Sequence, residues 1–202
     1  FSFLRGASHP GELVERAQAL GYQALALTDE CSLAGAVRAH QAAKVCGLKL
    51  ILGTEVLLQE GIKLVLLASD RRSYGAISSL ITAGRRRSRK GAYSLSRLDI
   101  EALSGKGVLA LWVPGDDFSA AGWIREVFEN AAWIAAELHC GPNDRARLEL
   151  LKKVSGEHQL PLVAAGDVHM HVRSRRRLQD VLTAVRLGKP LAGCGQALHP
   201  NA

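Results

Sequence analysis

Apolar residues recur along the chain at two alternating spacings, which predict helices separated by short strands. Intervals of three or four residues predict helices over 10–20, 33–46, 71–82, 97–103, 120–129, 144–155 and 175–187. Short, mostly apolar runs predict strands over 24–27, 49–58, 62–68, 108–113, 133–138 and 160–165. The turn at Glu60-Gly61 predicts that the second and third strands form a hairpin. This alternation is typical of an α/β protein with a mainly parallel sheet, either barrel-like or open.

The pattern continues from end to end without an internal repeat or a linker, so we predict one domain over 1–202. The last stretch, 191–202, has turn-forming residues and no period of its own. The chain begins with Phe1 rather than Met, and we expect it to be a fragment of a longer protein.

Composition narrows the classes of protein that fit this pattern. Apolar residues make up 48% and charged residues 22%, a balance typical of globular proteins. The longest unbroken apolar runs have six residues, whereas a membrane-spanning helix needs roughly 20. The net charge of +7 favours polyanionic partners. The four cysteines are scattered and form no CxxC pair, which predicts reduced thiols and a cytoplasmic location.

Acidic and imidazole side chains gather at or near the predicted ends of several strands. Functional loops of α/β folds lie at the carboxyl ends of their strands. The candidates are Asp29, Glu30, Glu55, His139, Asp167, His169 and His171. Carboxylates and imidazoles together suit Zn, Mn or Fe.

Each candidate also has a structural interpretation. An aspartate at the end of a strand commonly caps the next helix, and a single histidine commonly makes a structural hydrogen bond. Glu55 lies among strand residues and needs a partner if it is buried, so a salt bridge to an arginine is its alternative.

Nucleotide hydrolysis by the common routes is not supported. The sequence has no GxxxxGK[ST] loop, no GxGxxG and no GxSxG. Cys31 and Cys46 lie at helix ends without a paired base, which favours packing over nucleophilic roles.

Two basic clusters are candidates for contact with nucleic acid. The first lies in a predicted loop and comprises Arg85, Arg86, Arg87, Arg89 and Lys90. The second lies at the start of the last predicted helix and comprises Arg173, Arg175, Arg176 and Arg177, of which Arg175 and Arg176 are the candidates for contact. Aromatic residues are only 5% of the chain, so contact with phosphates is the most these cations are expected to supply. The alternative is a solvated surface.

Four segments in order resemble the PHP (polymerase and histidinol phosphatase) domain of bacterial C-family DNA polymerases, on the error-prone branch related to the DNA polymerase III alpha subunit. They are the opening FSFLRGASHPGELVERAQALGYQALALTDECSLAGAVRAH, then GLKLILGTEVLL, ITAGRRRSRKGAYSLSRLDIEAL and AAGDVHMHVRSRRRLQDVLTAVRLGKPL. The resemblance covers essentially the whole chain. It implies a distorted (β/α)7 PHP barrel, which here lacks its first strand with the His-x-His motif.

The resemblance also implies a metal site, with departures from the family pattern. Active members hold a multinuclear metal cluster at the carboxyl-end face of the barrel. Glu55, Asp167 and His169 match ligand positions, His139 is a further match, and His171 lies outside the usual set. Arg5 stands where active relatives carry Asp, and Glu30 where they carry His. An arginine repels divalent ions, so we expect Arg5 to replace an ion by pairing with Glu30 or Glu55. The remaining site, with Glu30 among its vestigial ligands, is then degenerate and binds metal weakly or holds one ion of Zn or Mn.

The resemblance therefore supports two functional hypotheses. In the first, this domain is a structural scaffold of a translesion DNA polymerase, whose Mg-dependent chemistry lies outside this chain. Its partners are the rest of the polymerase chain, DNA through that enzyme, and other mutagenesis or replication proteins, with no membrane. In the second, the domain is itself a metal-dependent phosphoesterase, a 3′-5′ exonuclease or pyrophosphatase, in which Asp167 and His169 bind the ion and Arg5 holds the phosphate. A free-standing nucleic-acid-binding module is a third alternative.

Overall fold

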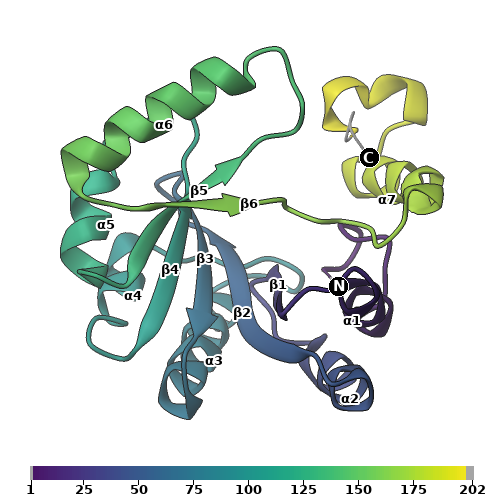
Figure 1. Ribbon diagram of the computed structural model, residues 1–202, viewed down its shortest axis with the longest axis horizontal. Coiled ribbons are helices and arrows are strands. Elements are labelled where there is room, and N and C mark those ends of the chain that lie inside the picture. The colour runs from purple at the N-terminus through teal and green to yellow at the C-terminus, as the bar shows by residue number, and fades with distance from the viewer. Residues whose placement is uncertain (1, 199–202) are drawn as a thin grey trace.

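The computed structural model describes residues 2–198, and its centre is one curled sheet of six strands. The strands follow one another across the sheet in chain order (Figure 1). They are β1 (Ala24–Glu30), β2 (Lys49–Leu57), β3 (Lys63–Ala68), β4 (Val108–Val113), β5 (Ala132–Glu137) and β6 (Leu162–Ala165). The sheet curls into a half-barrel, in agreement with the expected α/β fold with a barrel-like sheet.

Strand directions agree with the predicted mainly parallel sheet that contains one hairpin. The pairs β1–β2, β4–β5 and β5–β6 are parallel, but β3 runs antiparallel to both β2 and β4. The predicted hairpin is thus confirmed, since the short turn at Glu60-Gly61 reverses the chain direction between β2 and β3. As a consequence, the amino end of β3 lies at the edge where the other strands have their carboxyl ends.

Seven α-helices surround the described part of the sheet. They are α1 (Pro10–Ala19), α2 (Ala36–Cys46), α3 (Arg71–Arg86), α4 (Arg97–Glu101), α5 (Ala121–Phe128), α6 (Asp144–His158) and α7 (Arg176–Leu187). Short 3-10 turns, η1 (Arg173–Arg175), η2 (Leu191–Gly193) and η3 (Gly195–Ala197), flank α7, so the predicted irregular tail has local structure up to residue 197; residues 199–202 lie outside the described residues. Among the described residues, no helix has the length and apolarity needed to cross a membrane.

Helix α3 extends further than the sequence pattern predicts. The predicted helix ends at Thr82, but α3 continues to Arg86, so Arg85 and Arg86 belong to its last turn and not to a loop. Asp70 caps its start by accepting a hydrogen bond from the Ser73 backbone N–H at 2.7 Å. The extra turn is stabilised by contacts of Arg85 with distant backbone, which no local spacing could reveal.

The main hydrophobic core lies between the outer face of the sheet and helices α3 to α6 (Figure 1). Leu64, Leu66, Ala110 and Ile134 are fully buried on this face. A second, smaller cluster joins α1, α2 and β1. Gly53 shows how closely the strands pack, since a Cβ at this position would collide with the carbonyl oxygen of Leu66 on β3. The inner, concave face of the sheet is only partly covered, and the candidate site lies there.

Candidate functional site

The pleat of the sheet places charged residues from five strands or strand ends on the inner face. Glu30 and Glu55 are paired in the parallel register of β1 and β2, so their side chains point to the same side. Lys63 lies diagonally across the hairpin from Glu55, which pairs with Val65. Glu137 ends β5, and Asp167 follows β6 by two residues. All five therefore meet at one edge of the half-barrel.

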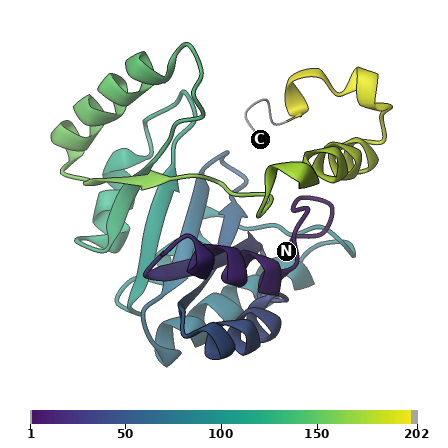
Figure 2. The ribbon, with the colours of Figure 1, turned by 45° about the vertical axis from the view of Figure 1, so that its right-hand side comes forward.

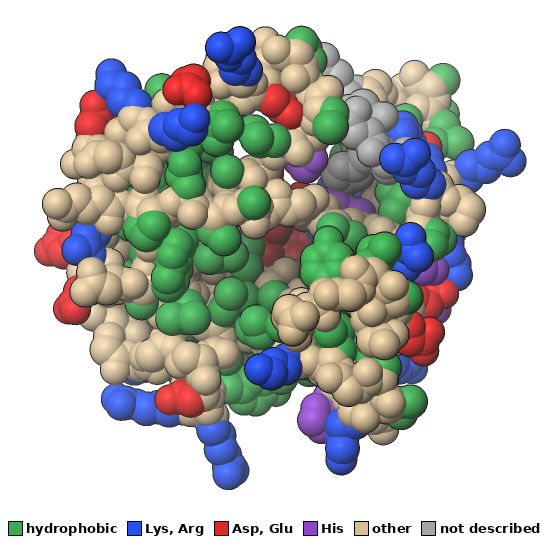
Figure 3. Space-filling model, viewed as in Figure 1, with side chains coloured by type: hydrophobic (Ala, Val, Ile, Leu, Met, Phe, Trp, Pro, Cys, Tyr) green, Lys and Arg blue, Asp and Glu red, His purple; other side chains and the backbone are tan. Residues whose placement is uncertain are grey.

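The four acids of this group, Glu30, Glu55, Glu137 and Asp167, line a cavity of about 460 Å³ inside the half-barrel. Its floor is apolar, with Val65, Leu67 and Leu111 from the sheet, and its acidic groups lie at one end. In Figure 3 acidic side chains are visible at the bottom of a hollow that apolar side chains surround. The cavity thus combines a hydrophobic surface with a cluster of carboxylates.

Arg5 pairs directly with the carboxylate at the end of β1. Its Nη2 donates to Glu30 Oε1 at 3.1 Å, and its Nε makes a second close contact with Glu30 Oε2. Its Nη1 lies 3.9 Å from Glu55 Oε1. The Gln179 side chain of α7 donates to the Arg5 carbonyl oxygen at 2.6 Å, which holds this segment in place. The guanidinium therefore points into the cavity and bridges β1 and β2.

Lys63 is a second cation in the same cluster. Its Nζ lies 3.0 Å from Glu55 Oε2 and 3.6 Å from Asp167 Oδ2. Burial by itself lowers the pKa of Lys63, but the negative charges of Glu55, Asp167 and Glu137 outweigh it and raise that pKa. Lys63 is therefore charged at neutral pH and neutralises carboxylates from β2 and from the segment after β6.

Glu137 is the acid of the cluster for which no salt bridge is found among the described residues. Its pKa is raised, first by burial and then by the negative charges of Asp167 and Glu55, with Lys63 and His139 acting in the opposite direction. Together, Glu30, Glu55, Glu137 and Asp167 supply four carboxylates against the two cations Arg5 and Lys63. The cluster keeps an excess of negative charge.

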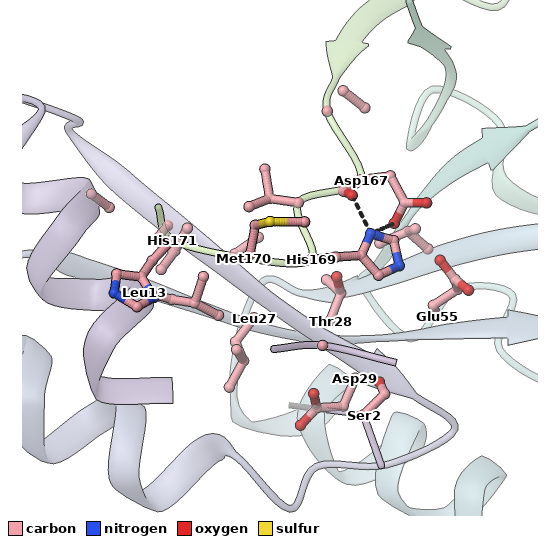
Figure 4. A pocket seen from close by; sticks show the side chains of 18 of the residues that line it. Ser2, Leu13, Leu27, Thr28, Asp29, Glu55, Asp167, His169, Met170 and His171 are labelled. Carbon is pink, nitrogen blue, oxygen red and sulfur yellow. Dashed lines mark hydrogen bonds and ion pairs between the residues drawn. The ribbon is translucent and has the colours of Figure 1, made fainter. Parts of the chain in front are cut away.

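The segment after β6 places His169 beside Asp167 in the cavity, whereas His171 lies further along beside Leu13 (Figure 4). His169 Nδ1 lies 2.6 Å from the Asp167 carbonyl oxygen and 3.9 Å from its Oδ1. Asp167 has a φ of 44°, in the left-handed region that a non-glycine residue rarely adopts. This turn brings the aspartate and the histidine side by side at the end of β6.

The other sequence candidates have structural partners outside the acidic cluster. His171 Nδ1 lies 2.7 Å from the Ser8 hydroxyl, and Asp29 accepts the backbone N–H of Gly35 at 3.1 Å, in the turn before α2. His139 is exposed on the loop after β5 and is not among the residues that line the cavity. Structural hydrogen bonding thus describes both Asp29 and His171, and Asp29 binds the N-cap residue Gly35 rather than capping α2 itself.

Glu30 has a further partner that the sequence did not indicate. The Tyr93 hydroxyl donates to Glu30 Oε1 at 3.2 Å and accepts the Leu57 backbone N–H at 3.0 Å. Burial is the first cause that raises the pKa of Tyr93 to about 12, so it remains a hydrogen-bond donor at neutral pH. Sequence reasoning did not identify Tyr93, Lys63 or Glu137 as site residues, because none of them belongs to a motif. Only Lys63 gave a signal, as a lysine at the start of an apolar strand.

The described residues do not fit a multinuclear metal centre. Within 2–198, no group of three or more His, Cys, Asp or Glu side chains is arranged to hold a metal ion. The reason lies in the geometry, since Arg5 and Lys63 stand between the carboxylates that would have to converge on the ion.

The first basic cluster divides into internal and exposed residues. Arg85 donates to the carbonyl oxygens of Glu30 and Cys31, both at 3.2 Å, and its guanidinium lies 5.2 Å from the centre of the Tyr93 ring. Arg87 pairs with Asp99 at 2.7 Å, whereas Arg86, Arg89 and Lys90 are exposed. In the second cluster, Arg175 pairs with Glu12 at 2.6 Å and Arg176 with Asp180 at 3.5 Å.

The cysteines have the environment of packing residues. Cys31 and Cys194 are buried, Cys46 is half-buried and Cys140 is exposed, and all four are free thiols. Burial is the first cause that raises the pKa of Cys31 to about 11, which keeps it protonated and unreactive at neutral pH.

Comparison with known proteins identifies the family of this fold and site. A family model described as the PHP domain matches residues 1–159. The chain belongs to the PHP domain family. Its relatives include the error-prone DNA polymerases of Dechloromonas aromatica, 56% identical over 100% of this chain and 20% of that protein, and of Methylococcus capsulatus, 54% identical over 100% and 19%. This PHP domain thus spans about one fifth of the length of those curated relatives.

Solved structures confirm the fold of this PHP domain. An amidohydrolase from Chromobacterium violaceum is similar with a TM-score of 0.56 and 18% identity, over 82% of this chain and 84% of that one. A two-domain protein from Bacteroides vulgatus, described as containing a PHP-like metal-dependent phosphoesterase, gives a TM-score of 0.58 at 13% identity, over 98% and 60%. At these identities the likeness concerns the fold alone.

Proposed function

We propose that this PHP domain is a non-catalytic scaffold of a longer, cytoplasmic error-prone DNA polymerase that copies damaged template. The relatives named as error-prone DNA polymerases, each about five times as long as the matched region, support the first part of this proposal. The observation that carries the second part is the position of Arg5 and Lys63 among Glu30, Glu55 and Asp167. The acids of the site are engaged in ion pairs within the protein.

The two cations make metal binding unfavourable by simple electrostatics. Unit charges about 4 Å apart interact by about 4 kcal/mol at the effective dielectric constant of a protein site. Lys63 Nζ is within 3.6 Å of both Glu55 and Asp167, so a divalent ion held by these acids would also lie close to an ammonium. The ion pairs also connect β1, β2, β3 and the segment after β6, which stiffens the open end of the half-barrel.

In this scheme the domain supports chemistry that takes place elsewhere in the longer chain. Nucleotide transfer and its Mg ions belong to the polymerase module outside this chain, and DNA and other mutagenesis or replication proteins are partners of the whole enzyme. The exposed Arg86, Arg89 and Lys90 provide a surface that contacts phosphates without sequence preference.

The test uses the full-length enzyme, 3′-end-labelled DNA, and Mn or Zn. We expect no metal-dependent cleavage, and the same residual signal from the wild type and from Asp167→Ala. Equilibrium dialysis with Mn should show weak binding of at most one ion per PHP domain. The double variant Arg5→Asp and Lys63→Gln removes both cations and should bind Mn at least tenfold more tightly, whereas the exposed control Arg86→Gln should not. Metal-dependent cleavage that is lost in Asp167→Ala would refute the scaffold.

The second candidate function, a metal-dependent phosphoesterase, is favoured by one observation. The four carboxylates of the cluster exceed the two cations, and the raised pKa of Glu137 reflects this excess of negative charge as well as burial. A single Zn or Mn ion bound by Asp167 and His169 would reduce the excess, and Arg5 would then have to exchange Glu30 for a phosphate. The cleavage assay above distinguishes this candidate from the scaffold.

A further inference from the structure

Helix α7 turns its polar side toward the protein and its apolar side toward solvent. On the inner side, Gln179 and Thr183 are each 1% exposed, and the small Ala184 is the one apolar residue of α7 buried beside them among the described residues. Leu178, Val181 and Val185, at the spacing i, i+3, i+7, are 40%, 45% and 59% exposed on the outer side. A surface helix normally buries its apolar stripe, so this arrangement is the reverse of the usual one. We call the three residues the α7 stripe.

Polar contacts attach this helix and its flanking turns to the protein. Gln179 donates to the Arg5 carbonyl oxygen at 2.6 Å, and Arg175 pairs with Glu12 at 2.6 Å. No residue of α7 belongs to either of the two hydrophobic clusters found in 2–198. In Figures 1 and 2, α7 lies beside the open side of the half-barrel, away from α5 and α6. The apolar side of the helix therefore has no role in the core of this domain.

Basic residues border the α7 stripe. At 100° per residue, Arg177 and Arg186 project to opposite flanks of the stripe, and both are exposed. Arg173 and Lys189 are exposed at the two ends of the helix, while Asp180 is paired with Arg176. The surface thus has an apolar centre and a positive border, the mixed character of interfaces between domains of one chain.

We propose that the α7 stripe is the surface on which the remaining part of the longer polymerase chain docks, through an apolar patch with an acidic border. This inference rests on the proposed function. Two observations support this partner. The matched region is about one fifth of each relative, so most of the relatives' chain lies outside it. The positive border of the stripe is complementary to an acidic surface. By contrast, Val37 on α2 is an exposed apolar residue whose neighbours Arg38, His40 and Gln41 are polar and exposed. Such surroundings are typical of a residue in contact with solvent.

Cysteine accessibility in the full-length enzyme tests this interface directly. Val181→Cys and Val185→Cys report on the stripe, and Val37→Cys is the control, since Val37 is 69% exposed on a different helix. Each variant is treated with a maleimide, and the labelled peptide is quantified by mass spectrometry. We expect labelling at 181 and 185 to be at least tenfold slower than at 37 in the native enzyme and equally fast in denaturant. Equal native rates would overturn the interface.

The same preparation separates failure of this inference from failure of the proposed function. Primer extension across a damaged template reports on the polymerase, so an active enzyme with a freely labelled stripe refutes the interface alone. Protection that appears only when DNA is added would assign the stripe to nucleic acid, and protection that depends on protein concentration would assign it to a second copy. Either result overturns the proposal.

Charge reversal tests the acidic border of the partner surface. In the Val185→Cys background, Arg177→Glu and Arg186→Glu should each increase the labelling rate several-fold, because like charges would then face each other. Arg38→Glu, an exposed arginine on α2, is the matched control and should leave the rate unchanged. Unchanged rates in both border variants would refute the acidic border.

Discussion

Lys63 shows how one residue can determine the character of the whole site. Its ammonium lies within ion-pair distance of Glu55 and Asp167, which come from β2 and the segment after β6. Because its pKa is raised in the folded protein, this contribution to stability is complete below the unfolded pKa, near 10.5, and is lost as the pH rises through the higher folded value. The ion pairs therefore operate throughout the physiological range.

Replacing Lys63 by Met should lower the free energy of unfolding by about 2 kcal/mol at pH 7, between the effects of an exposed and a fully buried pair. The reason is that Glu55 and Asp167 would lose the charge that holds them together. Urea unfolding followed by tryptophan fluorescence measures the change. Lys152→Met, which breaks the exposed Lys152–Glu149 pair, should cost less than about 0.5 kcal/mol. Equal effects of the two variants would contradict the role of Lys63.

Glu137→Gln should stabilise the protein at pH 7. The raised pKa of Glu137 means that folding favours its protonated form, so stability falls as the pH rises from the unfolded value of 4.5 through the folded pKa. The neutral glutamine avoids this loss, and its advantage should disappear below about pH 4.5, where both states are protonated. Thermal melts at pH 4 and pH 7 provide the comparison. The exposed Glu126→Gln on α5 should show no such pH-dependent gain.

At the scale of elements, strand direction and helix length decide which side chains reach the site. Antiparallel β3 brings its first residue, Lys63, to the edge where β1 and β2 end. The additional turn of α3 carries Arg85 to the carbonyl oxygens that follow β1. Arg85 thereby links a helix, the end of a strand and the Tyr93 ring. It acts as a structural arginine within a cluster that otherwise includes exposed residues.

Arg85→Ala should lower the free energy of unfolding by about 2–3 kcal/mol, since it removes charge-assisted hydrogen bonds and a cation–π contact. Arg86→Ala, its exposed neighbour on the same turn, should change stability by less than about 0.5 kcal/mol. Urea unfolding measures both. DNA affinity should depend on Arg86 and not on Arg85; the opposite dependence would show that Arg85 contacts nucleic acid.

At the scale of the whole molecule, the protein consists of a hydrophobic body and a polar attachment. The sheet and helices α3 to α6 share one continuous core, whereas α7 is held through Arg5, Glu12 and Gln179. The segment before α1 is thus the connection between the acidic site and the C-terminal helix. A substitution in this segment should therefore affect both the acidic site and α7.

Glu12→Gln should loosen α7 without unfolding the sheet. It removes the charge that pairs with Arg175 at 2.6 Å, so amide hydrogen exchange over 176–187 should become several-fold faster at pH 7. Exchange in β4, at the centre of the core, should not change. Glu15→Gln, an exposed acid on the same helix, is the control. Uniformly faster exchange in both α7 and β4 would show instead that Glu12 supports the whole fold.

Much of the architecture follows from patterns among residues that are close together in the sequence. Hydrophobic spacing located every strand and every α-helix to within a few residues, and the Glu60-Gly61 turn predicted the hairpin. Asp167 and His169 were also placed at the end of β6 by sequence position alone. Asp29, at the end of β1, has a structural hydrogen bond to Gly35, although the expected side-chain cap of α2 is not formed. These features depend on residues that are close together in the chain.

What only the tertiary structure decided are the partners of the charged residues. Lys63 and Glu137 looked like ordinary strand residues, and Arg85 like one cation among several. Their roles arise from contacts between segments that are far apart in sequence, which are determined by strand order, direction and register. An ion pair produces no periodic pattern in the sequence, because its two residues must be close in the folded structure but can lie at any separation along the chain. The pattern of residues thus determined the strands, the helices and the hairpin, and only their packing determined that the sheet curls and that cations of the chain itself stand among the acids.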